Sequence, residues 1–182
     1  LWLIEIARNM GSRFTFHPAL DWTPVWSPDG ARIVFASPRE GPESLYQKVS
    51  SGAGNEELLL KTGSRIYAND WSRDGRHFLY SALDAKARSD LWVLPLDGDR
   101  KPKPYLQTEF EETQGQFSPD GKFVAYSSNE SGRYEVYVQP FPASGGKGMI
   151  SSGGGAQPRW RRDGKEIFYI GTGRRLMAAE VK

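Results

Sequence analysis

The sequence predicts an all-β fold built from repeated four-stranded antiparallel sheets. One motif recurs four times in register along the 182 residues. Each copy contains a run of aromatic and β-branched residues, which are typical of strands. The chain also has 20 glycines and 12 prolines, an unusually large share, which indicates many tight turns. Short strands, frequent turns and a repeat of this length together favour a blade-like architecture.

The repeated motif centres on an anchor aromatic residue that is followed by an Asp-Gly pair. Its copies are PVWSPDGARIVFAS at 24–37, NDWSRDGRHFLYS at 69–81, GQFSPDGKFVAYS at 115–127 and PRWRRDGKEIFYI at 158–170. The anchors, separated by 45, 46 and 43 residues, are Trp26, Trp71, Phe117 and Trp160. An apolar pair follows each anchor 16 to 20 residues later: Leu45-Tyr46, Leu91-Trp92, Val136-Tyr137 and Leu176-Met177. We expect the large anchor side chains to lie in the core.

Each repeat divides into four strands, named A to D in chain order. Strand A ends at the anchor, as in residues 23–27, and strand C carries the apolar pair. Strand D is a weaker run, as in residues 57–61 and 148–151. Strand B is the aromatic and β-branched run, expected at 32–37, 76–81, 122–127 and 165–170.

Strand B has apolar residues at consecutive positions, for example Ile33, Val34 and Phe35. A strand with one solvated face would alternate apolar and polar residues, so strand B is expected to be covered on both faces. Neighbouring blades of a β-propeller supply that covering. A barrel or sandwich of the same length would show stricter alternation.

The Asp-Gly pair of each copy is interpreted as a turn between strands A and B. Pro28 presets the first central φ of a type I turn, Asp29 suits the next position, and Gly30 can adopt the left-handed conformation that follows. An Asp repeated four times also suggests a metal site. Because the turn explains the Asp without a ligand, we predict no metal site and no cofactor.

Counting strands predicts a partial ring within a single propeller segment, 1–182. Residues 1–20 supply strands C and D of one blade, and residues 157–182 supply strands A, B and C of another. Three complete blades lie between them, at 22–62, 67–108 and 113–152. The open edges are expected to pair with the remainder of the ring or with another copy. The chain lacks an initiator Met, which suggests a piece of a longer protein.

Composition and missing motifs exclude several functions. The net charge of +2 does not fit a nucleic-acid binder, and the absence of cysteine excludes thiolate chemistry. The apolar run at 1–4 is too short to insert into a membrane. No GxSxG, HExxH, P-loop, dinucleotide or kinase signature is present. The two histidines are expected at the surface (His17) and partly buried in a strand (His77). We therefore predict a non-catalytic chain.

The remaining candidate site is the axial channel that strands A line in a propeller. The residues just before the anchors are Val25, Asp70, Gln116 and Arg159 at one level, and Thr23, Ala68, Gln114 and Gln157 at a second. Further out lie Asp21, Glu111 and Glu112. Such groups suit a small polar ligand, a peptide end or a cation, although a water-filled polar channel is the alternative. The candidate ligand-binding residues are Asp21, Asp70, Glu112, Gln114, Gln116, Gln157 and Arg159.

The WSPDG turn, the apolar strand after it and the Leu-Tyr strand about 20 residues further on resemble the TolB-like, WD-like β-propeller repeat, over essentially the whole chain. Three phrases more narrowly resemble the C-terminal propeller of bacterial multidomain serine/threonine protein kinases: SDLWVLPLDGDRKPKPYLQTEF at 89–110, FSPDGKFVAYSSNESGRYEVYVQPFP at 117–142 and QPRWRRDGKEIFYI at 157–170.

The kinase resemblance implies a sensory or scaffold domain that binds a protein, a peptide or a small polar ligand, in an extracytoplasmic (periplasmic) location. Two alternatives remain open. One is the gating propeller of a prolyl-oligopeptidase-like serine peptidase, and the other is a TolB-type envelope scaffold.

Overall fold

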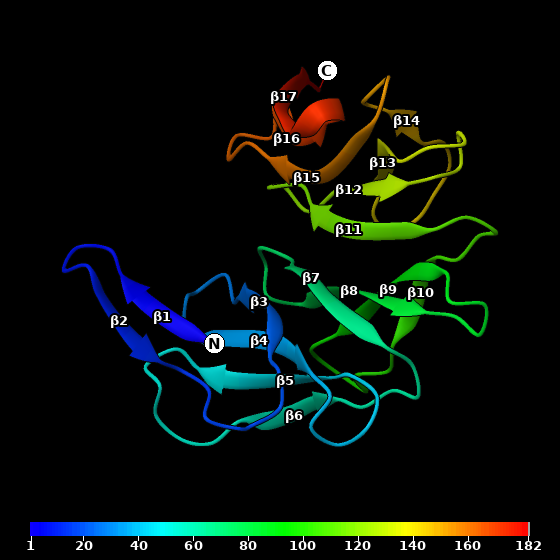
Figure 1. Ribbon diagram of the computed structural model, residues 1–182. Helices are drawn as coiled ribbons and strands as arrows, with labels where there is room; N and C mark the ends of the chain where they lie inside the picture. Colours follow the sequence, from blue (N-terminus) through cyan, green and yellow to red (C-terminus); the bar gives the residue numbers. More distant parts are fainter. Residues whose placement is uncertain (182) are drawn as a thin grey trace. The chain divides into compact units, whose positions relative to one another are not determined.

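The computed structural model describes residues 1–181 and confirms the all-β fold (Figure 1). Helical structure in these residues is a single 3₁₀ turn, η1 (Thr172–Arg174), and they contain no helix with the length and hydropathy of a membrane span. The chain divides into two compact units, residues 1–68 and residues from 69 onward, with the boundary inside strand β7.

The first unit contains a two-stranded and a four-stranded antiparallel sheet. The two-stranded sheet pairs β1 (Trp2–Glu5) with β2 (Met10–Arg13). The four-stranded sheet has its strands side by side in chain order: β3 (Trp22–Trp26), β4 (Arg32–Ser37), β5 (Ser44–Val49) and β6 (Glu57–Leu60).

Two four-stranded sheets and a three-stranded sheet follow, and every neighbouring pair is again consecutive in the chain. The first is β7 (Ile66–Trp71), β8 (His77–Leu83), β9 (Ser89–Pro95) and β10 (Lys103–Leu106). The second is β11 (Glu112–Phe117), β12 (Phe123–Ser128), β13 (Glu135–Pro140) and β14 (Gly148–Met149). The third is β15 (Gly155–Trp160), β16 (Glu166–Gly171) and β17 (Arg175–Glu180).

These sheets confirm three complete blades and two partial ones. Strand B of the first complete blade has the predicted limits, whereas the other B strands begin one residue later than expected. The expected D strand at 148–151 is shorter, because only Gly148 and Met149 pair with β13.

The Asp-Gly pairs form the predicted turns. Gly30 has φ +71 and donates its N–H to Ser27 O at 2.9 Å. Asp29 Oδ1 accepts the Ala31 N–H at 2.9 Å and the Ser27 hydroxyl, and Ser27 Oγ in turn accepts the Arg32 N–H. The same contacts recur around Asp74 and Asp120. These aspartates therefore serve the turn, and no cluster of metal-binding residues occurs in residues 1–181.

Strand β12 shows why the B strands are apolar at consecutive positions. Val124 and Tyr126 pack in one cluster with Leu79 and Leu91 of the preceding sheet. Ala125, between them in sequence, packs on the other side with Ile167 of the following sheet. Both faces of the strand are thus covered, and residues 124–128 are fully buried. In the first unit a separate cluster joins Phe14, Ile33, Phe35 and Tyr46.

The expectation that all four anchors lie in the core is wrong for Trp26, whose side chain is 53% exposed. Phe117 is buried, and Trp71 and Trp160 are partly buried. Trp160 Nε1 donates to Gln116 O of the preceding A strand at 3.1 Å. The sheet before Trp26 contains only the counterparts of strands C and D, so within residues 1–68 no preceding A strand can cover this side chain.

Candidate functional site

Three of the A strands that carry predicted channel residues contain a break in register. Pairing shifts between Trp22 and Val25 in β3, between Thr113 and Gln116 in β11, and between Ala156 and Arg159 in β15. One residue in each break has positive φ: Thr23 at 47°, Gln114 at 58° and Gln157 at 55°. Such bulges redirect side chains away from the regular alternation of a strand.

The bulged residues connect successive A strands. In the first unit, Thr23 Oγ1 accepts the Ala68 N–H at 3.2 Å. In the second, Gln114 Oε1 accepts the Gln157 N–H at 2.8 Å. The side chain of one A strand therefore binds the backbone at the equivalent position of the next. Gln114 Oε1 also accepts the Ser127 hydroxyl at 3.1 Å, which fixes its orientation.

A second set of contacts joins β7 to β11. Asp70 Oδ2 accepts the Phe117 N–H at 2.8 Å, and Gln116 Nε2 donates to Asn69 O at 3.0 Å. Burial raises the pKa of Asp70 to about 6, although the Phe117 and Trp71 N–H groups and the charge of Arg159 oppose this shift. Asp70 thus takes up a proton more readily than an exposed aspartate does, in the field of a cation two blades further along the chain.

Arg159 and Gln157 are the predicted site residues that the structure leaves exposed. Arg159 Nη1 donates to Pro158 O at 2.7 Å, so part of its guanidinium is held by its own strand. Hydrogen bonds therefore link the Asp70 and Gln116 segments of β7 and β11 and join Gln114 to Gln157, whereas Arg159 acts on Asp70 through its charge alone in the described contacts.

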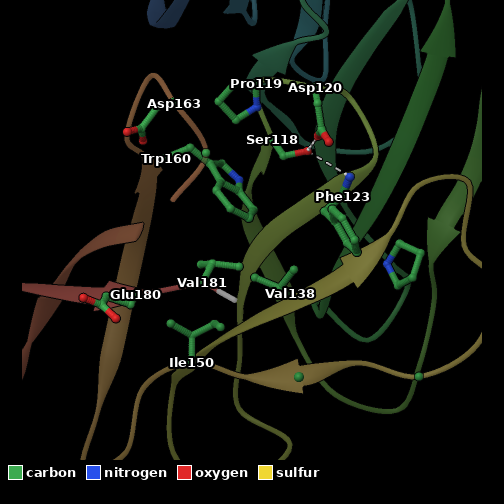
Figure 2. A pocket seen from close by; sticks show the side chains of 14 residues that line it. Ser118, Pro119, Asp120, Phe123, Val138, Ile150, Trp160, Asp163, Glu180 and Val181 are labelled. Carbon is green, nitrogen blue, oxygen red and sulfur yellow. Dashed lines mark hydrogen bonds between the residues drawn. The ribbon is translucent and has the colours of Figure 1, made fainter. Parts of the chain in front are cut away.

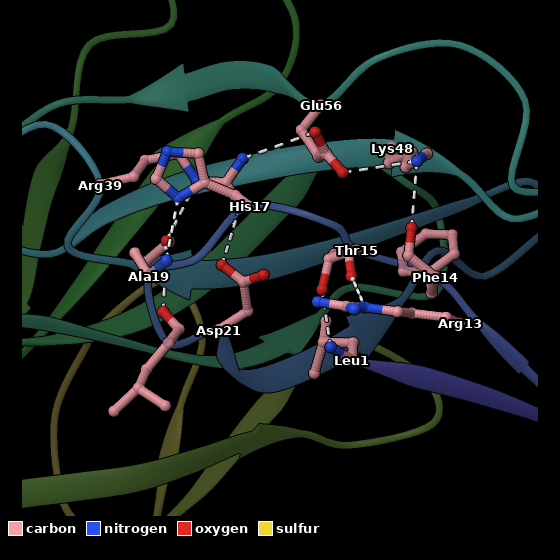
Figure 3. A network of polar contacts seen from close by, with 12 residues as sticks. Leu1, Arg13, Phe14, Thr15, His17, Ala19, Asp21, Arg39, Lys48 and Glu56 are labelled. Carbon is pink, nitrogen blue, oxygen red and sulfur yellow. Dashed lines mark hydrogen bonds and ion pairs between the residues drawn. The ribbon is translucent and has the colours of Figure 1, made fainter.

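Asp21 belongs to a different arrangement, a polar network in the first unit (Figure 3). Arg39 Nη2 donates to Asp21 Oδ1 at 2.7 Å and also faces Glu56, which pairs with the buried Lys48. Burial raises the pKa of Asp21, but hydrogen bonding from Ser37 and Arg39 outweighs it and holds the pKa below its ordinary value. Lys48 Nζ donates to Phe14 O at 3.0 Å, so the network fastens the segment after β2 to β5.

Glu112 is buried at the start of β11, with 2% of its surface exposed. Its Oε1 accepts the Thr108 hydroxyl. Its neighbour Glu111 is partly buried and binds the Tyr134 hydroxyl. Neither carboxylate contacts Asp70 or Arg159 in the hydrogen bonds and ion pairs of the described residues.

Sequence reasoning missed an apolar groove between the last two sheets (Figure 2). This cavity has a volume of about 660 Å³ and lies between the Asp-Gly turns of the two repeats. Phe123 is 39% exposed on it, and the partly buried Trp160, Ile150 and Val181 also line it. The sequence signal for this groove was Phe123 itself. In the backbone contacts of the turn, Phe123 occupies the position that Arg32 and Glu166 hold in two other repeats.

The junction one repeat earlier is filled differently. There Phe141 packs against Phe117 with ring centroids 5.0 Å apart, and against His77 at 5.1 Å. His77 is thus a partly buried strand residue, as expected, and its ring is engaged with an aromatic neighbour. His17 is exposed, and its Nδ1 accepts the Ala19 N–H at 3.1 Å. Neither histidine is paired with a serine in these contacts, and they form no triad.

Comparisons with known proteins agree on the fold. No family model matches the chain. The Tol-Pal system protein TolB of Anaeromyxobacter dehalogenans is 29% identical over 98 residues, 54% of this chain and 22% of that protein. The crystal structure of TolB from Acinetobacter baumannii superposes with a TM-score of 0.78 at 20% identity, over 97% of this chain and 44% of that one. A prolyl endopeptidase structure gives 0.69 at 13% identity, over 99% and 30%.

These likenesses show a TolB-like β-propeller fold. The chain spans 37% or less of the curated relatives that it matches first, and less than half of that TolB structure. The activities and partners of those whole proteins therefore enter only as proposals.

Proposed function

We propose that this chain is a non-catalytic β-propeller segment that binds a protein or peptide partner, or a small polar ligand, at the exposed ends of its A strands. The observation that carries the proposal is the exposed guanidinium of Arg159, whose charge acts on the carboxyl of Asp70 without pairing with it in the described contacts. A guanidinium with free donors suits a carboxylate, which it can bind through two parallel hydrogen bonds. The group recognised is accordingly an acidic side chain or a peptide C-terminus.

The seven candidate residues have four roles in this proposal. Gln157 and Arg159 contact the partner, and Asp70 sets the charge beside them. Gln114 and Gln116 position those residues, because they bind the adjacent A strands. Asp21 in the first unit and Glu112 in the second are each held in contacts of their own and support the start of their own A strand.

The experiment is a binding measurement on a library of acidic hexapeptides, each prepared with a free and with an amidated C-terminus. We expect Arg159→Gln to weaken binding of the free-acid hits about tenfold or more, since a hydrogen bond to a charged group contributes about 1.5–3 kcal/mol. The matched control is Arg162→Gln, which removes an exposed arginine from the neighbouring turn. Equal affinities for the two variants would overturn the proposal, as would a library without a binder.

For the biological setting, we propose a sensory or scaffold domain attached to a bacterial serine/threonine kinase, on the extracytoplasmic (periplasmic) side. The similarity of the phrases at 89–110, 117–142 and 157–170 to such propellers supports this setting. Sequencing the parent reading frame tests it. A kinase catalytic loop and a membrane span upstream are expected, and their absence would refute the attachment.

Two alternatives rest on the comparisons. The structural likeness to a prolyl endopeptidase supports a gating propeller, which requires a GxSxG hydrolase domain in the parent protein. The likeness to TolB in sequence and structure supports an envelope scaffold, which requires a secretory signal and a small domain before the propeller. The same reading frame separates all three.

The partial blades suggest a further partner, the remainder of the ring or another copy. On β17, which has no strand D beside it, Leu176 is 72% exposed, and Trp26 is uncovered in the first unit. Unpaired edges and exposed aromatics of this kind favour strand addition. Sedimentation of the 182-residue chain tests for self-association, and a monomer at all concentrations would exclude another copy.

A further inference from the structure

The segment that joins β10 to β11, residues 107–111, is fastened by two side chains at its start. We call it the connector. Gln107 Nε2 donates to Asp90 Oδ2 at 3.2 Å, and the Thr108 hydroxyl donates to Glu112 Oε1. Two consecutive connector residues thus bind two carboxylates, one on β9 and one on β11.

Each carboxylate has a second oxygen that is buried without a partner. Asp90 is 3% exposed and Glu112 is 2% exposed. Asp90 Oδ1 and Glu112 Oε2 have no hydrogen bond to any described residue. An ionised carboxylate buried in this way is costly, because the lost hydration of the free oxygen is not replaced.

The next repeat provides an internal comparison. Glu135 precedes Val136 of its apolar pair as Asp90 precedes Leu91. Glu135 Oε1 accepts the N–H groups of Gly153 and Gly154 at 2.9 and 2.7 Å, and its Oε2 accepts the Ser151 hydroxyl. The equivalent position therefore holds a carboxylate with both oxygens satisfied, and the unsatisfied state of Asp90 is a local feature and not a requirement of the fold.

The charges around the pair do not neutralise it. The charge of Asp84 raises the pKa of Asp90 and the charge of Arg88 lowers it. Arg88 is itself paired with Asp84. Burial raises the pKa of Asp90. Burial also raises the pKa of Glu112, and the charges of Asp90 and Glu130 add to that shift.

Arg88 Nη1 also donates to Glu109 O of the connector at 2.8 Å, and Lys147 is paired with Glu130. At Glu135, by contrast, burial is outweighed by the Ser151 hydroxyl and the two glycine N–H groups, and the pKa is lowered.

We propose that Asp90 and Glu112 form a buried acid pair that takes up a proton under mildly acidic conditions, so that the connector is held more firmly at low pH and loosens as the pH rises. The proton comes from solvent and bonds to one of the two unpartnered oxygens, which removes the buried negative charge of that carboxylate. The connector leads directly into β11, so its order determines how firmly the Gln114 and Gln116 contacts are held.

The sign follows from the direction of the shifts. In the folded chain the pKa of each carboxyl is raised above its ordinary value, 3.8 for Asp90 and 4.5 for Glu112, which we take to hold in the unfolded chain. The stabilisation is therefore complete at a pH below the ordinary pKa values, and it is lost as the pH rises through the raised pKa values of the folded chain.

The test compares melting temperatures of the 182-residue chain from pH 4 to pH 8. Glu112→Gln and Asp90→Asn keep one oxygen for the connector and replace the unpartnered oxygen by an N–H donor. We expect each variant to melt about 2–4 °C above the unmodified chain at pH 8 and with no advantage at pH 4. The matched control Glu135→Gln replaces one of two satisfied acceptor oxygens by an N–H donor, so it should melt below the unmodified chain at pH 8.

Amide hydrogen exchange at pH 8 shows whether the effect is confined to the connector. Glu112→Gln should slow exchange at residues 109–111 relative to the unmodified chain. The proposal is overturned if both amide variants are destabilising at pH 8, or if their advantage is independent of pH. A melting temperature that rises on addition of CaCl₂ in the unmodified chain, but in neither variant, would also overturn it, because the pair would then hold a cation.

Discussion

Replacing Gly115 by alanine tests how closely neighbouring sheets pack. Gly115 lies on β11 between two of the candidate site residues, and a Cβ added there would lie 2.5 Å from Leu79 Cδ2 and 3.2 Å from Leu91 Cδ2. Both leucines are fully buried on the preceding sheet, so neither has free space to move into. Overpacking of this kind costs about 1–3 kcal/mol. For a chain of this size, that lowers the melting temperature by about 2–12 °C.

The assay is urea unfolding of the variant together with two comparisons. Gly148→Ala changes another strand glycine, where an added Cβ would meet no atom within 4 Å, and should leave the free energy of unfolding nearly unchanged. In a Leu79→Ala background the obstructing atom is absent, so adding Gly115→Ala should cost little. A neutral Gly115→Ala, or the same cost in both backgrounds, would refute close packing of β11 on the preceding sheet.

Two further predictions concern the anchors and Asp70. Trp160→Ala should lower the free energy of unfolding by about 2–4 kcal/mol, because this side chain packs between sheets, whereas the exposed Trp26→Ala should cost under about 1 kcal/mol in the same denaturant titration. Equal losses would contradict the assignment of Trp160 to the core. The raised pKa of Asp70, about 6, means that its contribution to stability is lost as the pH rises from about 4 through 6, so Asp70→Asn should reduce that loss in urea midpoints. Asp74→Asn should instead remove stability at neutral pH, since the Ser72 hydroxyl lowers the pKa of Asp74. If Asp70→Asn and Asp74→Asn changed the stability at neutral pH in the same direction, the argument would be contradicted.

Most of the fold was predictable because the chain repeats its own pattern. The apolar run at 32–37 and the Asp-Gly turn before it are local signals, and each defines a hairpin without reference to the rest of the molecule. The exposure of Trp26 was not predictable from the same pattern. Burial of an anchor depends on the preceding A strand, as the bond from Trp160 to Gln116 shows, and the motif around Trp26 carries no information about that neighbour.

The candidate site was only partly predictable. Spacing placed Asp70, Gln116 and Arg159 at one level; hydrogen bonds join the strands of the first two, and Arg159 acts on Asp70 through its charge. The use of Gln114 to bind the next A strand depends on a bulge with positive φ, which no glycine marks in the sequence. The unpartnered oxygens of Asp90 and Glu112 could not be foreseen either, since they result from the course of the connector and not from either residue type.

The most direct test of the account is residue-resolved amide hydrogen exchange on the intact chain. If stacked sheets cover one another, the amides of β12, with sheets against both of its sides, should open only with global unfolding and exchange most slowly. The amides of β2, whose residues Met10–Arg13 are all exposed, should exchange fastest among the strands. Similar rates for β12 and β2 would contradict mutual coverage of the sheets.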